Sequence, residues 1–250
     1  MGQRSMRVRV RVLKIGGSLL ERPTLLDDLA KWNGEAKWNG DGEIVPDVTI
    51  AIVGGGQMIE AMRCWDRLRP GDPVEVHWRC IEMLRFSFEA IRDAMRSHPG
   101  WKGFESIETA EHWNRFLGSL HADGLQTGGL QTGGLQTRGK RFVLLSVPAA
   151  YHRQLSGASS ESLPLPEDWR TTSDAIAIGL ANQMRELSRS WAASRSLSVQ
   201  CVLLKSCEVP PEWSLASLVQ AGIVDPACGD FADSGINLDV CSLPLTGAIN

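Results

Sequence analysis

The sequence predicts an α/β protein, a three-layer α/β/α sandwich in which helices cover both faces of a mostly parallel central sheet. Short apolar segments that suit buried strands, such as residues 48–53, alternate along the chain with longer segments of helical period, such as residues 74–95. Twice, an apolar segment runs straight into glycines and then into a helix. Alternating strands and helices favour parallel strands, because each connecting helix packs back onto the sheet.

The first strand is expected to end in a glycine turn. Valines and arginines alternate over residues 7–12, a period of two that places the valines on one face of a strand. Lys14 stands at the end of this strand, just before Gly16 and Gly17, where a backbone without side chains can approach a ligand closely. Ser18 is expected to cap the helix that follows.

This turn has the parts of a small phosphate site. Backbone amides, the positive end of a helix dipole and one lysine all attract an anion. The pattern is neither the G-x-x-x-x-G-K-[ST] phosphate loop nor the G-x-G-x-x-G dinucleotide motif. A tight turn beside a solvated lysine is therefore the alternative.

A second segment repeats this design. Residues 48–53 form an apolar strand, Gly54, Gly55 and Gly56 follow it, and residues 57–68 form an amphipathic helix. Two such turns in one α/β domain are able to face one polyphosphate from two sides. The alternative is a pair of ordinary turns between a strand and a helix.

The remaining helices and strands are predicted from the spacing of apolar residues and from the glycines and prolines that end each segment. Further helices are expected at residues 23–32, 74–95, 105–120, 175–187 and 214–221, and further strands at 141–147, 199–204 and 238–243. Loops are expected at residues 33–43 and 148–166.

Two charged residues stand at the ends of these later elements. Asp174 begins the helix at 175–187, where a carboxylate suits the helix dipole, and Thr172 or Ser173 is placed to cap that helix. Lys205 ends the strand at 199–204, as Lys14 ends the first strand. The simpler interpretation of Asp174 is a carboxylate that only stabilises the start of a helix.

One domain is expected to span residues 1–250, with two surface insertions. Residues 31–45 contain the sequence KWNG twice, and residues 97–138 include the unit GLQTG given nearly three times at 124–137. That repeat has no charge and few bulky groups, so it is expected to be a flexible segment without chemistry.

Composition argues against several classes of protein. The net charge of -3 gives no general attraction to nucleic acid or to an anionic membrane. No apolar run approaches the ~18 residues of a membrane span, and residues 1–10 are too polar for a secretory signal.

The cysteines and one histidine give no sign of a disulfide framework or a metal site. The 6 cysteines form no C-x-x-C pair, which favours free thiols in a reducing cytoplasm. His77 and Cys80 share a helix face, but two ligands do not make a metal site, so none is expected.

Five motifs occur in the order seen in the amino acid kinase superfamily, which the chain resembles over nearly its whole length apart from residues 31–45 and roughly 97–138. The motifs are KIGGS at 14–18, VGGG at 53–56, TSDAIAIGLA at 172–181, VLLK at 202–205 and GIVDP at 222–226. This superfamily includes aspartokinase, acetylglutamate kinase, uridylate kinase and carbamate kinase.

One branch of the superfamily is more similar than the others. The segments EVHWRCIEML at 75–84 and DWRTTSDAIAIGLA at 168–181 resemble the small archaeal-type kinases related to aspartokinase and uridylate kinase. These include the kinase of methanofuran biosynthesis, which phosphorylates aminomethylfuran-methyl phosphate. The resemblance implies a cytoplasmic homo-oligomer with the amino acid kinase fold, which uses ATP and Mg²⁺ to phosphorylate a small metabolite.

The resemblance also implies roles for matching residues. Lys14 would touch the transferring phosphoryl group, Asp174 would hold the lysines and help to organise Mg²⁺, and Lys205 would bind the nucleotide phosphates. The residues implied to surround the phosphates are Gly16, Gly17, Ser18, Gly54, Gly55, Gly56 and Ser173.

An acceptor that carries a phosphate needs a cation. Arg63, Arg79 and Arg170 are the candidates, and His77 belongs to a segment that resembles the branch. The alternative for each arginine is a solvated surface residue.

The loop after Lys205 departs from the superfamily pattern. Its members usually carry an Asp-Gly-like turn there, whereas residues 206–211 contain no glycine and end in two prolines. This difference bears on base binding and on ATP as the donor. Two alternatives therefore stay open: a kinase of an amino-acid carboxylate, and a non-catalytic protein that binds a nucleotide or an oxyanion.

Overall fold

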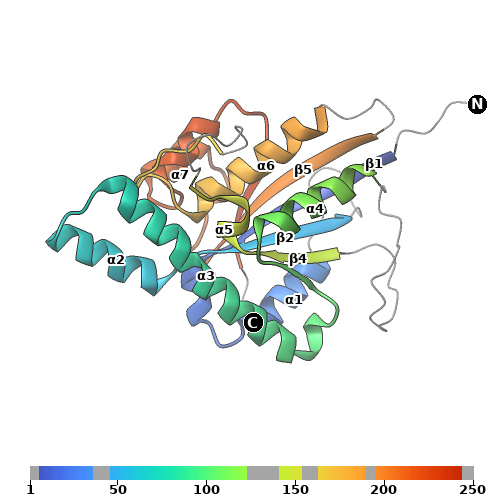
Figure 1. The fold of residues 1–250 in the computed structure, drawn as a ribbon, viewed down its shortest axis with the longest axis horizontal. Helices are drawn as coiled ribbons and strands as arrows, with labels where there is room; N and C mark the ends of the chain where they lie inside the picture. The colour runs from blue at the N-terminus through green and yellow to red at the C-terminus, as the bar shows by residue number, and fades with distance from the viewer. Residues whose placement is uncertain (1–5, 36–45, 123–140, 154–162, 190–194, 244–250) are drawn as a thin grey trace, which may run out of the picture.

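The structure is a computed structural model, and it describes residues 6–35, 46–122, 141–153, 163–189 and 195–243. Its centre is a sheet of six strands in the order β3-β4-β2-β1-β5-β6. Every pair of neighbouring strands in this sheet is parallel. The expected α/β class and parallel sheet are therefore confirmed, and Figure 1 shows the helices on either side of the strands.

The elements have the following bounds. The strands are β1 Met6–Ile15, β2 Val48–Val53, β3 Glu105–Ile107, β4 Arg141–Leu145, β5 Arg195–Lys205 and β6 Asn237–Ser242. The helices are α1 Leu25–Glu35, α2 Gln57–Leu68, α3 Pro73–Ser97, α4 Ala110–Ala122, α5 Val147–Ala150, α6 Ser173–Arg189 and α7 Leu215–Gln220. Short 3₁₀ helices span Gly17–Glu21, Pro99–Trp101 and Pro226–Phe231.

Two hydrophobic cores, one on each face of the sheet, make the three layers. Val10 and Val12 of β1 pack in the larger core with side chains of α4, α5 and α6, such as Ile176. Leu13 and Ile15 of the same strand pack in the other core with α1 and with the second half of α3. Successive residues of a strand point to opposite faces, so β1 supplies both cores.

The order of the strands indicates which edge of the sheet is suited to a binding site. The chain passes from β1 to β2 on one side, extends that side with β4 and β3, and then returns to β5 on the other side of β1. In such sheets ligands bind beyond the carboxyl ends of the strands, where the order of the strands reverses. The ends of β1, β2 and β5 are therefore the place to look for a site.

Three expectations about the elements are wrong. The region 105–120 is not one helix, because residues 105–107 form β3 at the edge of the sheet before α4 begins. The described part of the supposed insertion 97–138 is not a surface segment, since Trp113, Phe116 and Leu120 of α4 are buried in the larger core. Residues 148–150, expected to begin a loop, belong to α5, which takes in residue 147 from the expected strand as well.

Two further expectations meet the structure only in part. Helix α1 continues to Glu35, so the start of the supposed loop 33–43 is helical, and residues 36–45 lie outside the described residues. The GLQTG repeat at 124–137 also lies outside the described residues. No helix in the described part of the chain has the length and apolar character needed to cross a membrane.

Candidate active site

Three charged side chains meet beyond the ends of the central strands. Lys14 comes from the end of β1, Lys205 is the last residue of β5, and Asp174 lies in the first turn of α6. The Nζ atom of Lys14 lies 2.8 Å from Oδ1 of Asp174, and the ammonium of Lys205 donates to Oδ2 of the same carboxylate. Lys14 is 6% exposed, Asp174 is 3% exposed and Lys205 is 7% exposed, so this network is buried.

The two lysines keep Asp174 ionised. Burial alone would disfavour a charged carboxylate, but the charges and hydrogen bonds of Lys14 and Lys205 outweigh burial, and the pKa of Asp174 is lowered. Two cations around one anion leave a net positive charge at this edge of the sheet. Such a site attracts a polyanion, and phosphoryl transfer requires that kind of charge stabilisation.

Asp225 is a fourth ionisable residue of the site, and the sequence marks it only as part of the GIVDP motif at 222–226. Its Oδ2 atom accepts hydrogen bonds from the hydroxyl of Thr172, from the backbone N of Thr172 at 3.2 Å and from the backbone N of Ala175 at 3.4 Å. Asp225 thus caps α6 from a distant loop, in place of the local cap expected from Thr172 or Ser173. Burial and the nearby charge of Asp174 raise the pKa of Asp225.

The two glycine turns pack backbone against backbone. The N–H of Gly54 donates to the carbonyl of Ile15 at 2.9 Å, which ties the turn after β2 to the end of β1. A Cβ atom on Gly17 would lie 2.1 Å from the backbone N of Gly56, which has φ of 54°. No larger residue fits at Gly17 without separating the turns, so glycine is required there by close approach.

These turns and the charged residues line one cavity of about 350 Å³. From the strand ends and turns the lining includes Lys14, Gly17, Ser18, Gly55, Gly56, Ser173, Asp174, Lys205 and Asp225. From the α2–α3 hairpin it includes the apolar side chains of Ile59, Cys80, Ile81 and Leu84. The cavity therefore joins a cationic wall rich in backbone amides to an apolar wall.

The two serines lie beside the glycine turns. Ser18 is inside the 3₁₀ helix Gly17–Glu21 and so does not cap it, because Gly16 occupies the position before the helix. The hydroxyl of Ser18 lies 2.5 Å from that of Ser206, which follows β5. Ser173 is buried at the start of α6 and lines the cavity.

The four residues proposed to contact an acceptor lie in different places. Arg63 lines the cavity, forms an ion pair with Glu60 at 3.0 Å and lies over the ring of Trp169. His77 also lines the cavity. Arg79 and Arg170 are exposed and do not line it.

His77 uses both ring nitrogens within the protein. Nε2 lies 3.0 Å from the hydroxyl of Tyr151, and Nδ1 lies 3.3 Å from the carbonyl of Asp168. A carbonyl only accepts, so Nδ1 carries the hydrogen and Nε2 accepts from Tyr151 when the ring is neutral. Burial is the main cause of a lowered pKa at His77, so the neutral ring is favoured.

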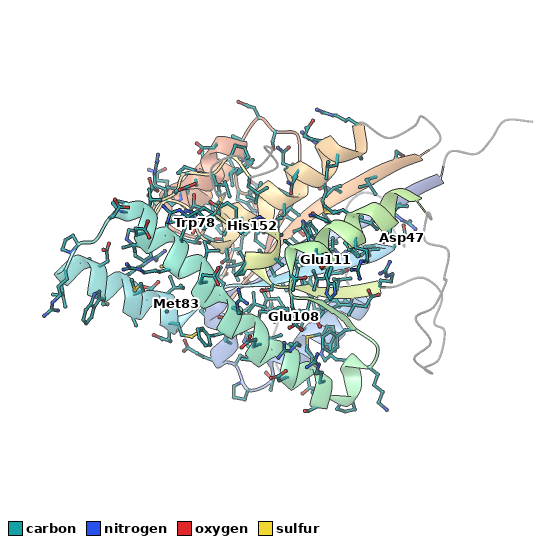
Figure 2. All side chains as sticks on the ribbon, viewed as in Figure 1. Asp47, Trp78, Met83, Glu108, Glu111 and His152 are labelled. Carbon is teal, nitrogen blue, oxygen red and sulfur yellow. The ribbon has the colours of Figure 1, made fainter. Side chains whose placement is uncertain are left out.

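The segment before α6 is fastened to the α2–α3 hairpin. The indole of Trp78, labelled in Figure 2, donates to Glu167 at 3.0 Å, and the indole of Trp169 donates to Asp66 at 2.7 Å. Together with the bond from His77 to Asp168, these contacts hold one wall of the cavity in place. That wall leads directly into the first turn of α6, which carries Asp174.

Among the described residues, no three His, Cys, Asp or Glu side chains gather in a way that could hold a metal ion. No protein-family model matches the sequence, and no curated protein matches it either.

Proposed function

We propose that this protein is an ATP-dependent kinase of a small metabolite, with the fold and chemistry of the amino acid kinase superfamily. One observation carries the proposal: the buried network of Lys14, Asp174 and Lys205 opens into the same cavity as two glycine turns in backbone contact. The order of the sequence motifs supports the same assignment.

In the proposed reaction the chain supplies positive charge and position. Lys14 contacts the transferring phosphoryl group, Lys205 contacts the phosphates of the nucleotide, and Asp174 holds both ammonium groups apart at fixed places. The amides of the glycine turns donate to phosphate oxygens. Phosphoryl transfer needs little covalent chemistry from a protein, so positioning and charge stabilisation account for most of the catalysis.

Mg²⁺ fits this site as a companion of the nucleotide. It is usually held by one or two carboxylates together with substrate phosphates, and not by a cage of protein ligands. Asp174 and Asp225 are the carboxylates beside the lysines, although Asp174 is already engaged by both ammonium groups. Mg²⁺ would neutralise charge on the phosphates of the nucleotide.

The apolar wall favours an acceptor with an apolar body. Ile59, Ile81 and Leu84 suit an apolar ring, while Glu60 and Arg63 of the same hairpin also line the cavity and suit an ammonium and an anionic group. Arg63 is the cation that the hairpin adds to the cavity lining. A phosphomonoester that joins an apolar ring to an amino group, such as aminomethylfuran-methyl phosphate, therefore suits this lining.

Transfer of label from γ-labelled ATP with Mg²⁺ tests the proposal. The acceptors are aminomethylfuran-methyl phosphate, uridine monophosphate, aspartate, acetylglutamate and carbamate. We expect label on the furan phosphate, and we expect Lys14→Ala to lower turnover about a thousandfold, because one lysine at ~4 Å contributes about 4 kcal/mol.

Each other outcome is informative. Label on a carboxylate would keep the kinase and replace its acceptor class. Bound ATP without transfer to any of these acceptors would favour the non-catalytic binding protein. A Lys14→Ala variant with unchanged turnover would remove Lys14 from the mechanism.

A further inference from the structure

Thr171 lines the cavity, and its hydroxyl has no hydrogen-bond partner within the described part of the chain. The residue is 5% exposed, and its Oγ1 atom is buried. A buried hydroxyl without a partner costs free energy, so each such group in a folded protein calls for an explanation. Because Thr171 belongs to the wall of the cavity, a ligand of the cavity is the partner that its position favours.

The backbone on both sides of Thr171 is held in place. The N–H of Thr171 donates to the carbonyl of Asp168 at 3.1 Å, and the same carbonyl accepts from Nδ1 of His77 at 3.3 Å. The carbonyl of Arg170 accepts from the N–H of Ala227 at 3.1 Å. The hydroxyl is therefore carried by a fixed turn, and a group that is already fixed needs little ordering when a ligand arrives.

The charges around this part of the wall favour an anionic ligand. Thr171 stands two residues before α6, a helix of 17 residues whose N-terminal end carries partial positive charge. The two lysines around Asp174 leave a net positive charge in the same cavity. The carboxylate of Asp168, three residues before Thr171, is paired with Arg170 at 2.8 Å. In such surroundings a hydroxyl is suited to donate to an oxyanion.

We propose that Thr171 is a specificity-determining residue of the acceptor site, and that its hydroxyl donates a hydrogen bond to an anionic oxygen of the acceptor, such as a phosphomonoester provides. This inference rests on the proposed function, because it takes the cavity to bind a phosphoryl acceptor. Of the other residues considered for the acceptor, His77 uses both ring nitrogens within the protein, and Arg79 and Arg170 do not line the cavity. Thr171 adds a neutral donor to the cation that Arg63 supplies.

The position of Thr171 favours the acceptor over the nucleotide as its ligand. The segment that carries Thr171 is fastened to the α2–α3 hairpin, because the indole of Trp169 donates to Asp66 at 2.7 Å. The guanidinium of Arg63 lies 5.4 Å from the centre of the Trp169 ring. Thr171 thus belongs to the wall that bears the apolar side chains and Arg63, whereas the nucleotide phosphates are assigned to Lys205 and the glycine turns.

Removal of the hydroxyl alone tests this inference. Valine has the shape of threonine without the hydroxyl. We expect Thr171→Val to raise KM for aminomethylfuran-methyl phosphate at least about tenfold, with a smaller change in kcat, because the loss of one hydrogen bond to a charged group has an effect of that size. Thr171→Ser keeps the hydroxyl and is expected to keep KM close to that of the natural protein.

Unfolding in urea with and without the same phosphomonoester gives a readout that a purely structural role would not move. Without it, Thr171→Val is expected to be at least as stable as the natural protein, because the folded state no longer buries a hydroxyl that lacks a partner. With it, the natural protein is expected to gain more stability than Thr171→Val, since the ligand binds the natural protein more tightly. Thr172→Val, in contrast, loses a hydrogen bond to Asp225 and is expected to be less stable in both conditions.

Ser87→Ala is the matched control. The hydroxyl of Ser87 on α3 is likewise buried without a partner among the described residues, but Ser87 does not line the cavity, so its removal is expected to leave KM unchanged. An unchanged KM in Thr171→Val would overturn this inference and leave the proposed kinase in place. A natural protein that transfers no phosphoryl group, yet binds the phosphomonoester more tightly than Thr171→Val does, would overturn the proposed function alone. A natural protein that the phosphomonoester does not stabilise would overturn the inference.

Discussion

Asp174 is the residue on which the balance of charge in the site depends. Its carboxylate is the shared partner of two buried ammonium groups, Nζ of Lys14 and Nζ of Lys205. Removal of either lysine leaves one cation paired with one anion. Removal of the carboxylate leaves two buried cations beside each other, and an uncompensated buried charge is strongly unfavourable.

We therefore predict that Asp174→Asn destabilises the protein far more than Lys14→Met. Loss of the carboxylate is expected to lower the free energy of unfolding by about 3–5 kcal/mol, whereas methionine retains the apolar stem of Lys14 and leaves a neutral pair. Unfolding in urea at neutral pH measures both values. Lys205→Met is the control and is expected to behave as Lys14→Met does. Equal losses in Asp174→Asn and Lys14→Met would show that the charges are balanced in another way.

At the scale of elements, the glycine turn after β1 and the glycine turn after β2 are in direct backbone contact, so neither can move without the other. The sequence predicted both turns, and it suggested that they face one ligand, but it gave no sign that they touch. The contact is so close that a Cβ on Gly17 would lie 2.1 Å from the backbone N of Gly56. Side-chain movement cannot relieve such an overlap, because both partners are backbone.

Gly17→Ala is accordingly expected to lower the melting temperature and to abolish nucleotide binding, since the turn after β1 must move away from the turn after β2. Calorimetric unfolding and titration with ATP check the two effects. Gly118→Ala in α4 is the matched control, because a Cβ there meets no atom within 4 Å. Alanine in a helix is more favourable than glycine by about 1 kcal/mol, so the control should gain stability. Retention of ATP binding in Gly17→Ala would contradict the proposed phosphate site.

The elements that the sequence predicted well are those with unambiguous local signals. Strand β2 and helix α2 have the predicted bounds, because an apolar run ends at three glycines and an amphipathic stripe follows. Strand β3 has 3 residues, too few to show a period, and it exists because β4 offers it a free edge. The residues of β3 by themselves do not show that β4 has an unpaired side.

Strand β1 shows another limit of pattern reading. Alternating valines and arginines are typical of a strand with one solvated face, yet Arg11 is 1% exposed. Its guanidinium lies 5.2 Å from the ring of Trp32, and burial lowers the pKa of Arg11 to about 10. The covering of the second face depends on helix α1 and on the position of β1 between β2 and β5, which are properties of the assembled sheet.

At the scale of the whole molecule, parallel topology explains why distant residues could be predicted to meet. Lys14 and Lys205 both end strands, and the carboxyl ends of neighbouring parallel strands share one edge of the sheet. Asp225 lies in the GIVDP motif, but it ends no predicted strand, and the motif does not indicate which residues it contacts. Its role as the cap of α6 depends on how the loop before the 3₁₀ helix Pro226–Phe231 packs on α6, so the motif alone did not predict that role.

Asp225 also links the stability of the whole fold to pH. Its raised pKa means that the folded state favours the neutral carboxyl more than the unfolded chain does. The stabilisation from the neutral form is complete below the unfolded value of about 3.9 and is lost as pH rises through the folded pKa. Asp174, with a lowered pKa, has the opposite dependence. Asp174 is present in the natural protein and in every variant of Asp225, so its contribution to the pH dependence largely cancels when their unfolding free energies are compared.

Asparagine at position 225 cannot ionise, but its amide oxygen still accepts from the backbone of Thr172 and Ala175. Asp225→Asn is therefore expected to be more stable than the natural protein at neutral pH, and the difference in unfolding free energy should shrink as pH falls toward 4. Asp225→Ala loses the cap of α6 and should be less stable than Asp225→Asn by about 1 kcal/mol at every pH. Urea unfolding of the three proteins across this range measures both differences. An Asp225→Asn variant that is less stable than the natural protein at neutral pH, by a margin that shrinks on acidification, would mean that the folded state favours the ionised carboxylate, and that Asp225 is held by the lysines as Asp174 is.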